Sequence, residues 1–225
     1  MRHLVFLHTA EVNVVTFERL TLELAPGTAT THIVDTELLA RARAFGVDDA
    51  ALEAALGARL QRFVGPGDLV VCTCSTIGGL AETIGQQRSV RTMRIDRPMA
   101  AEAVRLGRRI AVVAAVESTV EPTRALLRDE AASAGREIEL VVSVCSTAWE
   151  RFEANDVRGY ATAIADHARS IAPSADVIVL AQGSMSDAAD LLGDLGIPVL
   201  SSPRLGVSAA LRILGSLDAV SDPAG

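Results

Sequence analysis

The chain has 225 residues, is 49% apolar and carries a formal net charge of −7. This composition suffices for a folded core and excludes a disordered chain, and the acidic balance argues against nucleic acid or an anionic membrane as the main partner. All 21 basic residues are arginines. The absence of lysine excludes a lysine Schiff base, a pyridoxal-phosphate anchor and a phosphate-binding P-loop.

The sequence carries no sign of a membrane or secretory protein. Its longest apolar stretches, at residues 110–116 and 177–181, are too short to span a bilayer. The first residues lack the length and the cleavage site of a signal peptide. Three unevenly spaced cysteines, Cys72, Cys74 and Cys145, do not form a disulfide framework, so we expect a cytoplasmic protein.

In chain order, short β-rich runs alternate with Ala-, Leu- and Arg-rich helical stretches, which is typical of an α/β fold with parallel strands. Strands are predicted at residues 3–8, 29–34, 69–73, 91–95, 109–115, 137–143, 176–181 and 197–200. Helices are predicted at residues 13–24, 48–63, 99–107, 121–134, 149–171, 186–194 and 206–215. The tail at residues 218–225 contains Pro and Gly and is predicted to be loose.

The second four predicted strands follow the first four at a nearly constant offset. Strand starts at 3, 29, 69 and 91 recur at 109, 137, 176 and 197, which are offsets of 106 to 108. We infer an internal duplication: two pseudo-twofold-related lobes, each with a four-stranded, mainly parallel sheet flanked by helices. The lobes are predicted at residues 1–98 and 99–217, with 203–217 as a candidate to pack back on the first. One long doubly wound sheet is the alternative.

Two strand ends hold the residues best suited to chemistry. The segment "DLVVCTCSTIGGLAE" (68–82) runs from a strand through Cys74 and two hydroxyl residues to a helix, and "VIVLAQGSMSDAADLL" (177–192) repeats the pattern with Gln182. Ligands bind beyond the carboxyl ends of parallel strands. Two facing lobes would therefore bring both segments to one shared cleft.

Cys74 is the leading catalytic candidate. Backbone N–H groups at a helix start favour a thiolate, whereas the alternative is a small buried hydrophobic residue. Cys72 is expected in the core, since a Cys-x-Cys metal site would need two further ligands. Cys145, in a second Cys-Ser-Thr run, is a weaker candidate for the cleft, because the duplication aligns it with the region after residue 34.

Hydroxyl and backbone N–H groups at helix starts are suited to hold a carboxylate, although helix capping alone would also explain them. The candidates for substrate binding are Thr9, Ser75, Thr76, Ser118, Thr119, Gly183 and Ser184.

His8 ends the first predicted strand and could assist Cys74 as a base or orient the substrate. Arg97 and Arg204 each lie beside a proline after a strand and could pair with a carboxylate, or simply serve solubility. No role is predicted for His32 and Asp35. The single tryptophan and tyrosine, Trp149 and Tyr160, are expected to pack against the core.

These residues together resemble the aspartate/glutamate racemase superfamily, which includes hydantoin racemases, maleate isomerases and arylmalonate decarboxylases. The resemblance covers residues 3 to about 215. Cys74-Ser75-Thr76 is similar to the first Cys-Asn-Thr segment of the family. "VIVLAQGSM" is similar to the second, Cys-Ala-Gly-Met, with Gln182 in place of the second cysteine. Weaker similarities are His8-Thr9, Glu117-Ser118-Thr119 and "GIPVLSSP" (196–203).

The resemblance implies a cofactor-independent racemase or isomerase in which Cys74 transfers a proton, or adds, next to a carbonyl of a small carboxylate or cyclic amide. It also implies a homodimer. Gln182 cannot exchange protons at neutral pH, but its amide can donate a hydrogen bond to a developing oxyanion. Alternatives are a one-cysteine decarboxylase of a malonate-type substrate and a binding protein without catalysis. A cysteine hydrolase has little support, because no His with an Asn or Asp partner shows a recognisable spacing.

Overall fold

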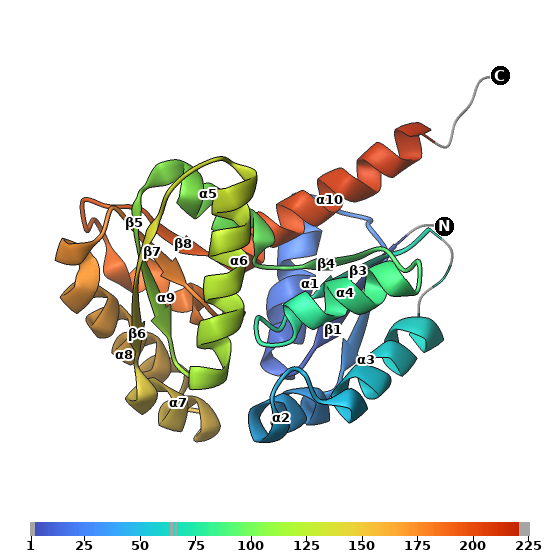
Figure 1. Cartoon of the computed structure of the whole chain (residues 1–225), viewed down its shortest axis with the longest axis horizontal. Helices are drawn as coiled ribbons and strands as arrows, with labels where there is room; N and C mark the ends of the chain where they lie inside the picture. Colours follow the sequence, from blue (N-terminus) through green and yellow to red (C-terminus); the bar gives the residue numbers. More distant parts are fainter. Residues whose placement is uncertain (1–2, 64, 66, 221–225) are drawn as a thin grey trace. The chain divides into compact units, whose positions relative to one another are not determined.

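The computed structural model of the chain describes residues 3–63, 65 and 67–220. The chain divides into two compact units. The first contains the residues up to Ile95 together with the segment from Pro203, and the second is Asp96–Ser202. Each unit has one four-stranded parallel sheet with helices packed on it (Figure 1).

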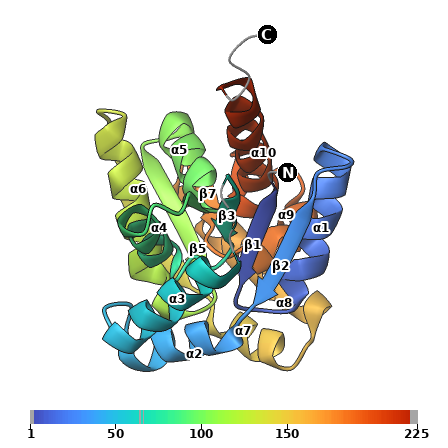
Figure 2. The same ribbon diagram turned by 90° about the vertical axis from the view of Figure 1, so that its right-hand side faces the viewer.

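The sheet of the first unit has the order β2-β1-β3-β4. Its strands are β1 (Leu4–His8), β2 (Thr30–Val34), β3 (Leu69–Cys72) and β4 (Thr92–Arg94). Figure 2 shows β1 between β2 and β3. The two central strands are buried along their whole length and are apolar apart from the equally buried His8, as expected for parallel strands covered on both faces. Edge strand β2 is only partly buried.

Alternate residues of these strands supply two separate cores, because successive side chains point to opposite faces. The helices of the first unit are α1 (Val12–Leu24), α2 (Thr36–Phe45), α3 (Ala50–Phe63), α4 (Gly78–Gln87) and most of α10 (Ser202–Val220). Val5 and Val70 pack with Leu38, Leu56 and neighbouring residues of α2, α3 and α4. The opposite face packs against α1 and α10.

The second unit repeats this topology with the order β6-β5-β7-β8. Its strands are β5 (Arg109–Ala114), β6 (Glu139–Val144), β7 (Val177–Leu180) and β8 (Val199–Ser201). Its helices are α5 (Arg97–Leu106), α6 (Val120–Ser133), α7 (Ser146–Glu153), α8 (Val157–Ile171) and α9 (Ser186–Leu192), with short 3-10 turns η1 (Glu117–Thr119), η2 (Ala172–Ser174) and η3 (Gly183–Met185). α7, α8 and α9 cover one face, and α5 packs on β7 and α6.

The predicted fold class is confirmed. The chain forms two similar α/β units, each with its own sheet, and not the alternative of one long sheet. All eight strands lie where the sequence pattern predicts them. Helices α2 and α4 are missing from the predicted ranges, although a helix was expected to follow Cys74, and the single helix predicted at 149–171 is in fact α7 and α8. Residues 218–220, predicted to be loose, belong to α10, and residues 221–225 lie outside the described part.

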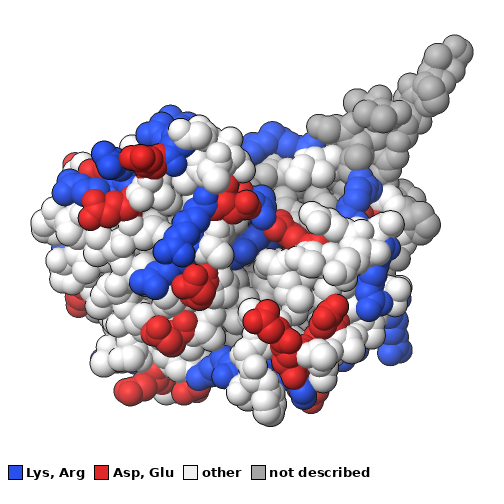
Figure 3. Space-filling view, in the orientation of Figure 1, with Lys and Arg blue, Asp and Glu red and all other residues white. Residues whose placement is uncertain are grey.

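Acidic and basic side chains are interspersed on the face of both units that Figure 3 draws. Ion pairs also form within single helices, such as Arg105 with Glu102 at 2.7 Å and Arg169 with Asp166 at 2.7 Å. Among the helices of the described chain, none has both the length and the hydropathy needed to cross a bilayer.

Candidate active site

The hydrogen-bond register shows which strand-end residues correspond in the two units. Thr73 N donates to Leu7 O at 2.9 Å in the first unit, and Ala181 N donates to Val113 O at 2.9 Å in the second. The next residues along the chain, Cys74 and Gln182, therefore hold equivalent positions. The duplication consequently places an amide where the first unit has a thiol.

Cys74 lies between the end of β3 and the start of α4. It is 8% exposed and belongs to the core cluster that includes Leu38 and Ile77. Cys72 is fully buried in the same cluster and directs its Sγ to the carbonyl of Cys74 at 3.8 Å. The core position expected for Cys72 is thus observed, and Cys74 retains a small exposed area.

His8 is held by hydrogen bonds at both ring nitrogens. The Thr73 hydroxyl donates to Leu7 O at 3.2 Å, so its oxygen accepts from His8 Nδ1–H at 2.8 Å. His8 Nε2 then accepts from Nδ1–H of His32 at 2.9 Å. Among the described residues, no partner faces the buried Nε2 of His32.

Burial, and to a smaller extent the neighbouring His32, lower the pKa of His8 to about 3. The ring is therefore neutral near pH 7, and neither nitrogen is left to accept a proton from Cys74. This geometry does not support the expectation that His8 acts as a base. His32, for which the sequence predicts no role, is the outer member of this hydrogen-bonded chain.

The hydroxyl residues of the first unit lie at the same edge of the sheet. Thr9, Ser75 and Thr76 are all buried. Arg94, also buried, donates from Nη2 to Ser75 O at 3.3 Å. A Cβ at Gly78 would lie 2.9 Å from the Cβ of Arg94, so the glycine makes room for this arginine. The Gly pair was visible in the sequence, but its buried arginine partner was not predicted.

The strand-end residues of the second unit form a set of hydrogen-bond donors. Gln182 Oε1 accepts from Ala115 N at 2.7 Å, which leaves the amide NH2 as the group able to donate. The Ser118 hydroxyl is buried and has no hydrogen-bond partner in the described structure. Ser184, in η3 with Gly183, shares a hydrogen bond of 2.9 Å with the hydroxyl of Tyr160. Thr119 is buried beside Ser118 in η1.

The two arginine candidates pair with carboxylates of their own unit. Arg97 Nη1 donates to Asp129 at 2.8 Å and to Glu130 at 2.5 Å. Asp129 lies ten residues beyond Thr119, about 15 Å further along α6, so Arg97 is not brought together with the substrate-binding candidates of η1. Arg204 pairs with Glu23 of α1 at 2.7 Å.

Cys145 occupies a different position from Cys74. Cys145 N donates to Ala114 O at 2.7 Å, as Asp35 N donates to His8 O at 2.9 Å, which makes Cys145 the counterpart of Asp35. Its Sγ contacts Thr147 Oγ1 at 3.6 Å and Ala163 O at 3.7 Å. This confirms that the duplication does not align Cys145 with Cys74.

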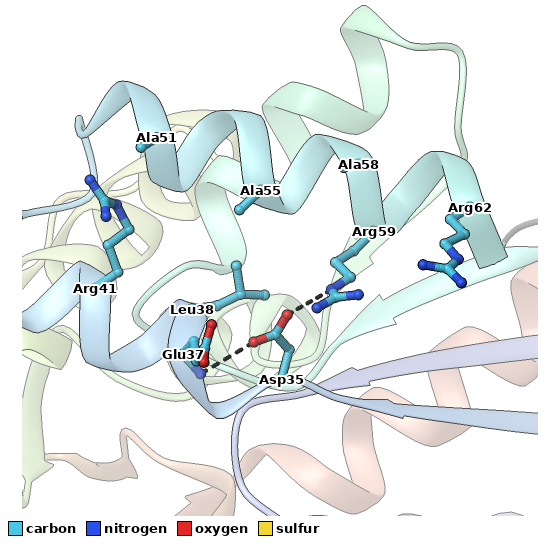
Figure 4. A pocket seen from close by; sticks show the side chains of 9 residues that line it. All are labelled: Asp35, Glu37, Leu38, Arg41, Ala51, Ala55, Ala58, Arg59 and Arg62. Atoms are coloured by element: carbon cyan, nitrogen blue, oxygen red, sulfur yellow. Dashed lines mark hydrogen bonds and ion pairs between the residues drawn. The ribbon is translucent and has the colours of Figure 1, made fainter.

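A groove of about 380 Å³ lies between α2 and α3 and contains none of the predicted site residues (Figure 4). Asp35 accepts from Glu37 N at 3.2 Å, which caps α2, and pairs with Arg59 at 2.7 Å. These contacts join α2 to α3, so the charged residues of the groove are explained by their role in packing the two helices together. Within the described part of the chain, no cluster of three or more His, Cys, Asp or Glu side chains could hold a metal ion.

The architecture is thus a duplicated parallel α/β fold with thiol, hydroxyl and amide groups at its strand ends. Residues 15–210 match the family model described as Asp/Glu/Hydantoin racemase. The chain therefore belongs to the Asp/Glu/hydantoin racemase family.

Solved structures of racemases and of a decarboxylase share the fold. A glutamate racemase from Bacillus anthracis is 15% identical, with 98% of this chain and 84% of that chain covered and a TM-score of 0.71. An allantoin racemase from Pseudomonas fluorescens is 19% identical, with coverages of 96% and 92% and a TM-score of 0.62. A variant of arylmalonate decarboxylase is 17% identical, with coverages of 95% and 93% and a TM-score of 0.55. No curated protein matches the sequence.

Proposed function

We propose that the protein is a cofactor-independent racemase or isomerase that acts on a small carboxylate or cyclic amide. Cys74 is the residue that exchanges a proton at the carbon next to the carbonyl. Gln182 and the strand-end hydroxyls, with backbone N–H groups, bind the substrate oxygens. Family membership supports the racemase-type activity, while the choice of Cys74 rests on its position.

The observation that carries this proposal is the place of Cys74 at the carboxyl end of a central parallel strand. The thiol lies just before a turn and the N-terminus of α4, where backbone N–H groups favour an anion. Ser75 and Thr76 follow it directly. In such sheets this edge is where ligands bind.

The proposed step balances without a cofactor. The Cys74 thiolate takes the proton on the α-carbon, and the electron pair of the broken C–H bond moves onto the carbonyl oxygen. The family resemblance implies that hydrogen-bond donors at strand ends, such as the Gln182 amide, stabilise this enediolate, since fixed donors aimed at developing charge lower the barrier. The intermediate is then reprotonated at carbon, either by the Cys74 thiol on the same face or by water on the opposite face, and only the second route inverts the centre.

Decarboxylation of a malonate-type substrate is the second candidate, and Gln182 is the observation that favours it. Two-base racemisation needs a proton carrier on each face of the substrate, and an amide cannot serve as one. A decarboxylase generates the same kind of intermediate by releasing CO₂ and needs one thiol to protonate the carbon.

We also propose a homodimer in the cytoplasm. In the described structure none of the three cysteines forms a disulfide, which suits a reducing compartment. The dimer follows from the family resemblance alone, and sedimentation velocity of the full chain checks it. A monomer at micromolar concentration would contradict this part of the proposal.

Alkylation of the native protein tests the role of Cys74. We expect iodoacetamide to modify Cys74 fastest near pH 7 and a bound substrate to protect it, because a catalytic thiol is ionised and reachable. Cys72 and Cys145 are the internal controls, and mass spectrometry assigns the modified residue. Slow reaction of Cys74, equal to that of Cys72, would favour the binding protein without catalysis.

A further inference from the structure

Tyr160 is the single tyrosine of the chain, and it contacts a residue of the candidate site. Its side chain is 3% exposed and its hydroxyl lies 2.9 Å from Ser184 Oγ. Ser184 follows Gln182 by two residues, at the carboxyl end of β7. The tyrosine therefore reaches the site from α8, a helix that follows a different strand.

The start of α8 fixes the position of this ring. Asp156 caps the helix by accepting from Gly159 N at 2.9 Å, and its carboxylate pairs with Arg151 at 2.9 Å. Tyr160 N donates to Asp156 O at 2.9 Å, and the ring packs against Phe152 at 5.3 Å between centroids. A capped first turn and a packed ring leave the hydroxyl little freedom.

The first unit has the same cap without the tyrosine. Asp49 accepts from Leu52 N at 2.8 Å and pairs with Arg41, as Asp156 does with Gly159 and Arg151. The residue four positions after the capping aspartate is Glu53 in the first unit, where it is exposed. In the second unit the same position is Tyr160, which is buried. The helix start is therefore shared, and the tyrosine–serine contact is specific to the second unit.

Burial raises the pKa of Tyr160 to about 12, so the phenol keeps its proton at neutral pH. When this O–H donates to Ser184 Oγ, the serine proton is free to point to a ligand oxygen. Two further donors belong to the same end of this sheet: the Gln182 amide and the buried hydroxyl of Ser118, which has no partner among the described residues. Unpaired buried hydroxyls are rare in proteins and call for a partner.

We propose that Tyr160 is a positioning residue that acts through Ser184, and that Ser184, Gln182 and Ser118 hold a carboxylate group of the substrate. The substrate class rests on the proposed function, whereas the role of Tyr160 rests on the contacts of α8 and η3. A carboxylate accepts several hydrogen bonds at once, which suits a set of neutral donors.

A double-mutant cycle on ligand affinity tests this role. The probes are malonate and L-glutamate, with allantoin as a cyclic amide without a carboxylate, and isothermal calorimetry gives each Kd. We expect Tyr160→Phe to weaken carboxylate binding about three- to tenfold and Ser184→Ala to weaken it about as much. In the Ser184→Ala background, Tyr160→Phe should add nothing, because its effect passes through the serine.

A spectroscopic readout covers the case in which Tyr160→Phe folds poorly. In a Trp149→Phe background, Tyr160 is the main near-ultraviolet chromophore, and carboxylate binding should shift its absorption. Ser184→Ala should abolish this shift.

Three results would overturn the inference: independent, additive effects of the two substitutions, an unchanged tyrosine spectrum on binding, or no binding of either carboxylate to the native protein. The proposed function fails separately, when Cys74→Ala keeps its full turnover.

Discussion

His8 ends β1 with both ring nitrogens in hydrogen bonds, and this arrangement fixes its charge. A proton on Nε2 would displace the N–H of His32, and a buried imidazolium would have no carboxylate among its hydrogen-bond partners. Thr73, which accepts from His8, directly precedes Cys74. A neutral His8 therefore helps to hold the peptide that carries the candidate thiol.

This neutral pair predicts a loss of stability in acid. The pKa of His8 is about 3 in the folded state and 6.5 in the unfolded chain, so between these pH values the unfolded state binds more protons. The free energy of unfolding should therefore fall as the pH drops from 6.5, by at most about 1.4 kcal/mol per pH unit for this group. His32, whose pKa burial also lowers, adds in the same direction.

Urea unfolding of the native protein and of His8→Asn between pH 4.5 and 7 measures this slope. The variant should be less stable at pH 7 and should show a shallower pH dependence. Equal slopes in the two proteins would mean that His8 is protonated in the folded state.

At this scale the sequence predicts which residues lie at strand ends better than it predicts their partners. The positions of Cys74, Ser118 and Gln182 after strands could be located from apolar runs. The contact of Tyr160 with Ser184, and that of His8 with His32, each join residues 24 apart on different elements. Such pairs depend on tertiary packing, which no local pattern encodes.

The boundaries of the helices also depend partly on local sequence signals and partly on tertiary packing. Asp35 caps α2, and its Asp-Thr-Glu sequence is a local helix-start signal from which this helix was predictable. Asn155, in the left-handed region with φ 56°, ends the helical stretch before Asp156 starts α8. An Asn-Asp pair is a recognisable signal for the end of one helix and the start of the next. The apolar pattern continues on both sides of the pair, and it therefore favoured the prediction of a single helix.

Substitution of the two capping aspartates, Asp156 of α8 and Asp49 of α3, distinguishes an effect on helix stability from an effect on ligand affinity. Asp156→Ala should lower the free energy of unfolding by about 1 kcal/mol and also weaken carboxylate binding, because it frees the first turn that carries Tyr160. Asp49→Ala, the matched change in α3, should cost a similar amount of stability and leave affinity unchanged. Chemical denaturation and calorimetry measure both; equal affinities in the two variants would contradict the role assigned to α8.

Substitution by alanine is expected to have opposite effects on stability at two glycines of α10. A Cβ at Gly206 would collide with the side chain and the carbonyl of Ile95, so Gly206→Ala should destabilise the first unit by about 1–3 kcal/mol. Gly215 has open space around its Cα, and Gly215→Ala should stabilise the exposed helix by roughly 0.5–1 kcal/mol. Thermal unfolding of both variants checks the pair. A stabilised Gly206→Ala would mean that α10 does not pack closely on Ile95.

For the whole molecule, the repeated strand order explains why the fold was accessible from sequence. Each unit orders its parallel strands 2-1-3-4, and apolar runs at a constant offset reveal this repetition before any contact is known. The position of α10 was expected only as a candidate, with residues 203–217 packing back on the first unit; Ser202 belongs to the second unit and the segment from Pro203 to the first. Val207 and Ala210 pack with Phe17 there, a contact that strand spacing does not encode.

The divergence of the two units matters more for function than their similarity. Register makes Cys74 and Gln182 equivalent, yet one residue can carry a proton and the other cannot. The family relationship and the fold are compatible with both racemisation and decarboxylation. Under the proposed role of Cys74, the fate of the substrate α-carbon distinguishes the two reactions.

Hydrogen exchange into substrate tests this central claim most directly. The native protein, Cys74→Ala and the control Cys72→Ala are incubated in D₂O with aspartate, glutamate, allantoin, a hydantoin, maleate and malonates, and NMR follows deuterium at the α-carbon and release of CO₂. We predict deuterium incorporation or CO₂ release with the native protein and with Cys72→Ala, and its loss, by at least a hundredfold, in Cys74→Ala. Undiminished exchange or decarboxylation in Cys74→Ala would contradict the account.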